Sequence, residues 1–206
     1  WWPLLPVDTG STTDAGVILD AGGPDRPMRM VVRSDHSSDR TGLLAVEAGE
    51  DGTESWKLAY REDADLDTVE VSLDRSTAVL LWNVRGGLSE LEVLDITSDR
   101  PRVIARPPLP DVVASSPTIT ADGRLLAVMV ESLDEPPRVV MYDVEGRRWT
   151  GRGPHKPDPA PELVEFTARD GLEMTGWLYR AAPEGEPAPT VVYLHGGPEL
   201  SLIHIS

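Results

Sequence analysis

Ile119-Thr120-Ala121-Asp122-Gly123 opens the stretch of sequence that decides the fold. The chain continues through an apolar segment, Leu125 to Val130, and then through a polar loop to a second apolar segment, Arg138 to Val144, which contains Asp143. Short runs rich in Val and Leu that are bounded by Asp, Gly and Pro are typical of strands. Asp122-Gly123 is a dipeptide suited to a tight turn. The stretch therefore predicts consecutive β-strands joined by turns.

The same pattern occurs once more upstream. Val71-Ser72-Leu73-Asp74 precedes two apolar runs, Ala78 to Trp82 and Leu91 to Ile96, and Asp95 lies inside the second run. The corresponding aspartates are equally spaced, because 122 − 74 = 48 and 143 − 95 = 48. Four short strands in a repeat of about 40–50 residues are typical of a β-propeller blade. A β-sandwich built from similar hairpins is the alternative.

A fainter third copy precedes these two. Asp39 leads into Leu43 to Val46, and Trp56 to Tyr60 supplies the next strand. We therefore predict that residues 1–150 form a partial β-propeller of about three blades. A ring of seven or eight blades does not fit in this length, so the blades that close it are expected to be absent. Core packing between blades is expected for the tryptophans at strand positions, Trp56, Trp82 and Trp149.

Composition excludes several classes of partner and site. The net charge is −16 and the pI is near 4.5, so nucleic acid and anionic membrane surfaces are set aside as partners. The absence of cysteine excludes disulfides, thiolate metal sites and cysteine nucleophiles. The acidic clusters lack the spacing of a calcium loop, and no phosphate loop or dinucleotide fingerprint occurs. We expect a cytoplasmic protein with no metal and no cofactor.

A change of composition marks the end of the repeats. Residues 151–162 contain four prolines and are predicted to be a linker. Leu163 to Ala168 and Met174 to Tyr179 are predicted to form a hairpin around Asp170-Gly171. Thr190 to His195 is a near-continuous apolar run, which is typical of a strand buried on both faces.

His195-Gly196-Gly197-Pro198 follows this predicted third strand. Acyl transfer places negative charge on a carbonyl oxygen, and an enzyme stabilises that charge with preorganised N–H donors. Glycines allow the backbone to approach the substrate closely. In α/β-hydrolases one such donor lies in a His-Gly-Gly-type loop after the third strand. A plain turn is the structural alternative at this position.

Residues 164–198 resemble the start of the catalytic domain in the prolyl oligopeptidase family, particularly its acylaminoacyl-peptidase and dipeptidyl-peptidase-like branch. The matching stretches are Val164-Glu165-Phe166, Asp170-Gly171, Gly176-Trp177-Leu178 and Val191-Val192-Tyr193-Leu194-His195-Gly196-Gly197-Pro198. In that family a β-propeller precedes the α/β-hydrolase domain and gates access to the active site. The resemblance implies that Gly197 donates a backbone N–H to the oxyanion. It also implies that His195, Gly196 and Pro198 shape the loop.

The catalytic triad of such a peptidase has no match in this chain. No Gly-x-Ser-x-Gly motif occurs, and the family's Ser, Asp and His come later in the sequence. His36 and His155 lie in polar loops, and His204 belongs to a tail, residues 200–206, that resembles vector read-through. We therefore expect residues 163–199 to be only the start of the catalytic domain.

These observations predict a mainly β fragment: a partial propeller followed by the first strands of an α/β-hydrolase domain. The parent protein is expected to be a serine peptidase that hydrolyses short peptides through an acyl-enzyme, and the fragment itself is expected to be inactive. The alternative is a complete, non-catalytic β-propeller protein that binds a partner through its loops. An esterase or lipase is a third possibility, and the usual lack of an N-terminal propeller in those enzymes counts against it.

Overall fold

Three four-stranded antiparallel sheets, each built from consecutive strands, make up most of the structure. The structure is a computed structural model that describes residues 5, 10–50, 52–98, 100–132, 136–150, 161–180 and 182–194. In each sheet the strands pair in chain order. The first sheet contains β1 (Thr13–Asp20), β2 (Met28–Ser34), β3 (Gly42–Gly49) and β4 (Gly52–Ala59). The second contains β5 (Asp65–Val71), β6 (Thr77–Val84), β7 (Leu88–Asp95) and β8 (Arg102–Ala105). The third contains β9 (Val113–Ile119), β10 (Leu125–Glu131), β11 (Arg138–Asp143) and β12 (Arg148–Thr150).

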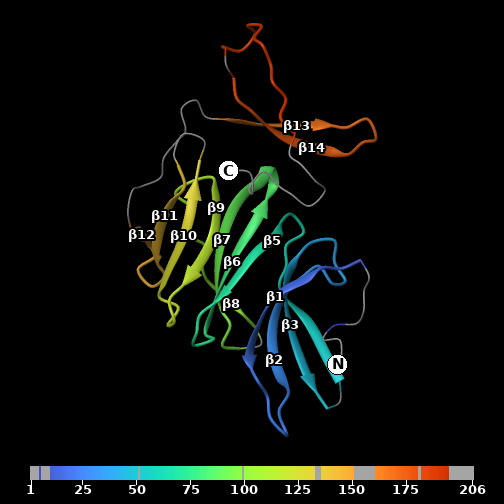
Figure 1. Ribbon diagram of the computed structural model, residues 1–206, viewed down its shortest axis with the longest axis vertical. Helices are drawn as coiled ribbons and strands as arrows, with labels where there is room; N and C mark the ends of the chain where they lie inside the picture. The colour runs from blue at the N-terminus through green and yellow to red at the C-terminus, as the bar shows by residue number, and fades with distance from the viewer. Residues whose placement is uncertain are drawn as a thin grey trace.

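The sheets lie beside one another in chain order, with the second between the first and the third (Figure 1). This arrangement confirms the prediction of a mainly β chain with blade-like sheets of four strands. Within the described residues the only helical element is the short 3-10 turn η1 (Arg85–Gly87), so no helix of an α/β-hydrolase is present there. None of the described segments forms a helix long and apolar enough to cross a bilayer.

Two apolar clusters hold the three sheets together. The first and second sheets meet through a cluster that includes Val31, Leu43, Leu66, Leu80 and Trp82. The second and third sheets meet through a cluster formed by Val79, Leu81, Leu91, Val93, Ala105, Ala114, Leu126, Val128, Val130, Val140 and Tyr142. Alternate residues of a strand point to opposite faces, so one strand can serve both clusters. In β6, Leu80 faces the first sheet while Val79 and Leu81 face the third.

The predicted tryptophan packing holds for two of the three residues. Trp82 is only 1% exposed and lies in the cluster between the first and second sheets. Trp149 packs on the other cluster, makes an edge contact with the Tyr142 ring at 5.0 Å, and donates from Nε1 to the Pro108 carbonyl at 2.6 Å. Trp56, on the outer strand β4, is half-buried.

The repeated aspartates occupy the same turn in two sheets. Asp74 accepts a hydrogen bond from the Ser72 hydroxyl at 2.6 Å, and Asp122 accepts one from the Thr120 hydroxyl at 2.7 Å. These hydrogen bonds lower the pKa of both carboxyl groups. The two turns also touch, because the Asp74 N–H donates to the Ala121 carbonyl at 3.0 Å. The 48-residue repeat is therefore a structural one.

The third copy lies one strand away from its predicted position in the repeat. Leu43 to Val46 belongs to β3, and Trp56 to Ala59 belongs to β4, the third and fourth strands of the first sheet. In the two clear copies the matching apolar runs form the second and third strands, β6–β7 and β10–β11. The predicted register was wrong because Asp39 precedes an apolar strand, as Asp74 does. Asp74 follows the first strand of its sheet, β5, whereas Asp39 follows the second strand of its sheet, β2.

A two-stranded hairpin follows the sheets. It consists of β13 (Glu162–Thr167) and β14 (Glu173–Leu178), as the sequence predicted. Its turn is closed by a hydrogen bond from the Ala168 N–H to the Leu172 carbonyl at 2.7 Å, and Gly171 has a φ of 92°. This left-handed conformation favours glycine, which explains the Asp-Gly pair. Residues 151–160 of the predicted linker lie outside the described residues, and Glu162 already belongs to β13.

The predicted strand at residues 190–195 is absent over its described part. Residues 190–194 have no regular structure, and Val191, Val192, Tyr193 and Leu194 are 90%, 77%, 67% and 81% exposed. A strand needs a neighbour to pair its backbone groups, and the described residues provide none beside this segment. The apolar run is correct for a buried strand, but the sheet that would bury it is not among the described residues.

Candidate oxyanion loop and the hairpin that precedes it

The candidate oxyanion loop begins where the described residues end. His195, Gly196, Gly197 and Pro198 all lie outside the described residues, and so does the tail 200–206. The role of Gly197 as an oxyanion donor and the shaping role of its three neighbours therefore stay predictions. The structure does describe the segment that leads to the loop, residues 182–194, which follows the hairpin and ends directly before His195.

The hairpin contacts the second sheet at the turn between β6 and β7. Strand β14 lies against η1, and the Arg85 guanidinium forms an ion pair with Glu165 of β13. Both side chains are 55% exposed, and ion pairs of this kind contribute only about 0–1 kcal/mol. In Figure 1 the hairpin sits above the end of the sheets where η1 lies. We call this end of the three sheets the hairpin end.

The hairpin leaves several large apolar side chains in solvent. Phe166 and Met174, which are paired in register, are 48% and 38% exposed, and Leu172 is 62% exposed. Partial burial raises the pKa of the Tyr179 hydroxyl. A two-stranded hairpin is marginal by itself and needs a further strand or a packed surface. A two-stranded hairpin with exposed apolar side chains is what we expect at the edge of a larger sheet.

The hairpin end carries a half-buried arginine between two carboxylates. Arg61, in the loop between β4 and β5, donates to Glu90 at 2.5 Å and to Asp63 at 3.0 Å. These bonds, first of all the one to Asp63, raise the pKa of the arginine, and the same contact lowers the pKa of the Asp63 carboxyl. The guanidinium also lies 5.7 Å from the centroid of the Trp82 ring. The group ties the loop between β4 and β5 to Glu90 of β7.

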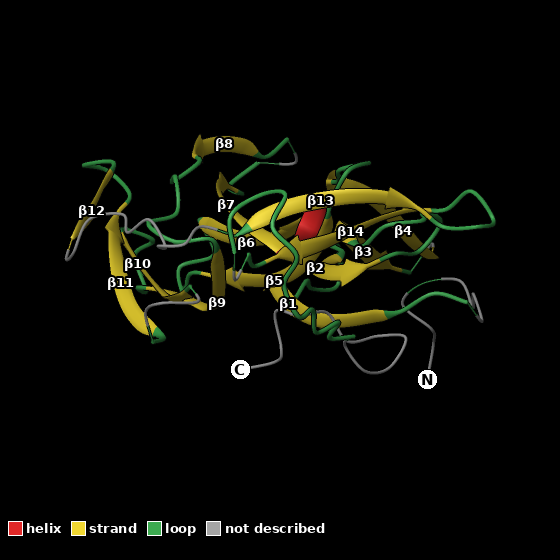
Figure 2. Ribbon diagram, turned by 90° about the horizontal axis from the view of Figure 1, so that it is seen from above, coloured by secondary structure: helices red, strands yellow, loops and turns green. Residues whose placement is uncertain are grey.

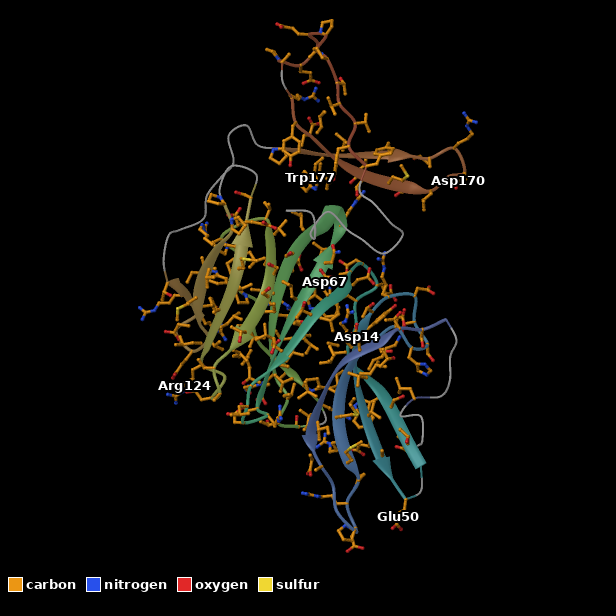
Figure 3. The ribbon with its side chains drawn as sticks, in the orientation of Figure 1. Asp14, Glu50, Asp67, Arg124, Asp170 and Trp177 are labelled. Carbon is orange, nitrogen blue, oxygen red and sulfur yellow. The ribbon has the colours of Figure 1, made fainter. Side chains whose placement is uncertain are left out.

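A second charged group joins β1 and β2 of the first sheet to β5 of the second sheet. Arg33 forms two 2.6 Å hydrogen bonds with Asp14 and donates to the Leu66 carbonyl at 3.0 Å. The hydrogen bonds raise the pKa of Arg33 and lower that of Asp14, and the charge of Asp67 adds to the first effect. Figure 3 labels Asp14 on β1 and Asp67 on β5. This contact fixes two neighbouring sheets at the hairpin end.

The third charged group is buried. The Asp111 side chain is 1% exposed and Arg138 is 20% exposed, and their closest atoms, Oδ2 and Nη2, are 3.3 Å apart. Asp111 precedes β9 and Arg138 begins β11, so the pair ties the connecting segment to its own sheet. Sequence reasoning singled out none of these arginines. Their partners lie on other strands, and only the strand register shows which charges meet.

The described residues contain no assembled catalytic or metal centre. His36 is the one histidine among them, and it lies in the polar loop after β2, as predicted, where its backbone N–H donates to Ser34 Oγ at 3.0 Å. His155, His195 and His204 fall outside the described part of the chain. No group of three or more His, Cys, Asp or Glu side chains in that part could hold a metal ion.

Solved structures share the fold of the sheets. A Mycobacterium tuberculosis puromycin-hydrolyzing peptidase matches with a TM-score of 0.66 and 20% identity, over 91% of this chain and 30% of its own. Prolyl oligopeptidase B from Galerina marginata, bound to a 35mer hydrolysis and macrocyclization substrate, matches with a TM-score of 0.61 and 14% identity, over 80% and 23% of the two chains. A prolyl endopeptidase studied for inter-domain dynamics in catalysis and specificity matches with a TM-score of 0.56 and 18% identity, over 71% and 22%.

Sequence comparisons add no relative. No protein-family model matches the chain, and no curated protein matches it. The chain spans 22–30% of the length of the three structures above. At identities of 14–20% the likeness concerns the fold. The three sheets thus resemble the β-propeller part of peptidases of the prolyl oligopeptidase family.

Proposed function

We propose that this chain is part of a serine peptidase of the prolyl oligopeptidase family, comprising three propeller blades and the start of the α/β-hydrolase domain. One observation carries the proposal: three blade-like sheets stand directly upstream of a hairpin and of His195-Gly196-Gly197-Pro198. Neither half of this pattern is specific alone, since propellers serve many functions and Gly-Gly-Pro is a common turn. Their order along the chain is what favours the peptidase.

The extent of the structural likeness supports the assignment of the C-terminal part. Residues 1–150 are 150 of 206, or about 73% of the chain, whereas the match to the puromycin-hydrolyzing peptidase covers 91%. That match therefore continues past the third sheet. It supports a hydrolase-domain origin for the hairpin β13–β14, whose exposed apolar side chains also suit a larger sheet.

The proposed chemistry is acyl transfer to water. A serine outside this sequence attacks the carbonyl carbon of a short peptide and forms an acyl-enzyme, which water then hydrolyses. The Gly197 N–H donates one hydrogen bond to the oxyanion, in the loop that His195, Gly196 and Pro198 shape. The 206-residue chain holds no nucleophile elbow, so by itself it is inactive. The propeller restricts access to short peptides, and the protein is cytoplasmic, with no membrane or nucleic-acid partner.

The reading frame of the source DNA tests this proposal. We expect the frame that encodes Pro198 to continue, in the intact gene, to a Gly-x-Ser-x-Gly motif followed by an Asp and a His. A natural stop codon close to residue 206 would overturn it. Expression of the longer frame then allows hydrolysis of peptidyl chromogenic substrates to be measured, with a Ser→Ala variant of the elbow serine as the control.

A second candidate is a non-catalytic propeller protein that binds a partner through its loops. The exposed segment Val191 to Leu194 favours it, because no hydrolase sheet incorporates that segment among the described residues. The same sequencing experiment separates the two candidates. A stop codon near residue 206 supports the binding protein, and a downstream triad supports the peptidase.

A further inference from the structure

Two turns of the molecule share an Asp-Gly pair and a similar backbone but differ in their surroundings. The chain contains three Asp-Gly pairs, and both residues are described in two of them, Asp122-Gly123 and Asp170-Gly171. In each turn the glycine N–H donates to the carbonyl three residues earlier, of Thr120 or Ala168, at 3.0 Å. Both glycines have a positive φ, 71° and 92°. The two turns are therefore a matched pair.

An Asp-Gly pair has a chemistry of its own. Glycine has no Cβ, so its backbone nitrogen can approach the side-chain carboxyl carbon of the preceding aspartate closely. The approach requires rotation of the aspartate side chain and of the peptide unit that follows it. Reactivity of the pair therefore depends on whether the surrounding structure lets the turn move.

The carboxylate of Asp122 is held within its own turn. It accepts a hydrogen bond from the Thr120 hydroxyl at 2.7 Å and another from the Arg124 N–H at 3.2 Å. These hydrogen bonds, first of all the one from Thr120, lower the pKa of the Asp122 carboxyl. A carboxylate that stays ionised and hydrogen-bonded is a poor target for attack by a backbone nitrogen.

The backbone of the same turn is fixed between the second and third sheets. The Asp74 N–H donates to the Ala121 carbonyl at 3.0 Å. Gly123 is buried, and a Cβ added there would lie 2.4 Å from Thr77 Oγ1. The Gly123 nitrogen can therefore move toward the carboxyl carbon only when the two sheets separate locally.

The turn at Asp170 is open to solvent. Asp170 accepts a hydrogen bond from the Leu172 N–H at 3.1 Å, and both Asp170 and Gly171 are exposed. A Cβ added at Gly171 would meet no described atom within 4 Å. Figure 3 labels Asp170 at the tip of the hairpin, and Figure 2 shows the turn between β13 and β14 at the outer edge of the molecule. A two-stranded hairpin is marginally stable, so its tip opens readily.

We propose that Asp170-Gly171 is a site of spontaneous isoaspartate formation and that the fold protects Asp122-Gly123 from the same reaction. The Gly171 nitrogen attacks Cγ of Asp170 in its acid form, a C–N bond forms, and the carboxyl hydroxyl leaves with the amide proton as water. Water then opens the resulting succinimide ring. Attack at Cγ restores aspartate, whereas attack at the backbone carbonyl carbon leaves the chain running through Cγ. One water is released and one is consumed, so the mass is unchanged and no other reactant is needed.

The product changes the hairpin. An isoaspartate adds one methylene to the backbone of a turn whose length fixes the register of β13 against β14. The pairing of Phe166 with Met174, close to that turn, is therefore weakened, and hydrogen exchange in both strands becomes faster. The modification rests on the geometry of the two turns and is independent of the peptidase chemistry.

Incubation of the folded 206-residue chain at body temperature and mildly acidic pH tests the proposal. An endoproteinase that cuts before aspartate but not before isoaspartate, followed by mass spectrometry of the peptides, reads the two sites separately. Isoaspartate is expected to form at position 170 at least about tenfold faster than at position 122, because the second turn must first open. Equal rates at the two positions, or a faster rate at 122, would overturn the proposal.

Denaturation and two matched variants separate the fold from the sequence. In guanidinium chloride both pairs lose their surroundings, so the two rates should agree within about twofold. A large ratio that persists in denaturant would assign the difference to neighbouring residues and overturn the proposal. Asp170→Glu should abolish the signal at 170, because glutamate would have to close a larger ring, whereas Asp122→Glu should leave that signal unchanged. A signal at 170 that survives Asp170→Glu would contradict the assignment.

Discussion

The second and third sheets are two copies of one repeat, and they differ in what surrounds them. In β6, six successive residues from Thr77 to Trp82 are buried, because one neighbouring sheet covers each face. In β10, burial alternates, because only the face toward the second sheet is covered. Both strands are similarly apolar. Whether a residue of these two strands is buried thus depends on whether a neighbouring sheet covers its face, and not on how apolar the strand is.

The same lesson applies at the C-terminal end. Val191 to Leu194 is as apolar as Leu80 to Trp82, yet it is exposed and forms no strand. The buried segment has hydrogen-bonding partners in β5 and β7 and apolar surfaces on both sides. The exposed one has neither among the described residues. An apolar run therefore forms a core strand only where neighbouring strands pair with it and apolar surfaces cover it.

The largest expected effect comes from placing a charge at equivalent positions of the two sheets. Val93→Asp buries a carboxylate in the cluster between the second and third sheets, and should cost more than about 3 kcal/mol of unfolding free energy. Met141→Asp, 48 residues later, should change it by less than about 0.5 kcal/mol, because Met141 is already 42% exposed. Urea unfolding followed by circular dichroism measures both. Similar losses in the two variants would break the comparison.

A smaller contrast is expected at the hairpin end. Asp111 corresponds to Asp63, since 111 − 48 = 63, but Asp111 is buried with Arg138 whereas Asp63 is exposed. Asp111→Ala leaves the arginine without its buried carboxylate and should cost about 3 kcal/mol. Asp63→Ala should produce no resolvable loss, since Arg61 keeps Glu90 and solvent. Chemical denaturation at low and high salt separates them, and only the Asp111 effect should persist in high salt. A salt-sensitive loss at Asp111 would argue against burial.

The Asp-led turns should behave alike, because their geometry is shared. Folding lowers the pKa of Asp74 and Asp122, so the stabilisation is present above their unfolded pKa and is lost as pH falls through the lower, folded pKa. The relevant window lies below about pH 4. Asp74→Asn and Asp122→Asn should each reduce the steepness of acid unfolding in this window by a similar amount. Thermal melts from pH 2 to pH 6 test this, and an effect in one variant alone would contradict the equivalence of the turns.

The smallest effect is expected at the contact between sheet and hairpin. Glu165→Gln removes the ion pair with Arg85 and should change global stability by less than about 0.5 kcal/mol, because both groups are half-exposed. Hydrogen exchange should nevertheless become faster in β13 and β14 and stay unchanged in β6. Glu173→Gln, at the other end of the hairpin, serves as the control. Faster exchange in β6 would show that the hairpin supports the sheet, contrary to expectation.

Sequence reasoning reached the local structure and missed what depends on distant partners. The spacing of Asp74 and Asp122 revealed the repeat, since turn chemistry and apolar runs are local features. The outer strand β8 escaped notice because it is short and only partly apolar, and β12 was indicated only by Trp149. The first sheet was read one strand out of register because Asp39 imitates the repeated aspartates.

The candidate site is predictable from sequence only as a motif. His195 to Pro198 is recognisable because glycines after an apolar run have a known use in acyl transfer. The buried Asp111–Arg138 pair and the Arg33–Asp14 contact had no such signal. Their residues are 27 and 19 positions apart, and strand register alone brings them together.

Fluorophosphonate labelling tests the proposed peptidase most directly. The probe is added to the 206-residue chain and to the protein encoded by the extended reading frame, and the labelled residue is identified by mass spectrometry. We predict that the longer protein is labelled on the serine of a Gly-x-Ser-x-Gly motif and that the 206-residue chain is not labelled. Labelling of the 206-residue chain, or a folded longer protein that no fluorophosphonate modifies, would contradict the assignment.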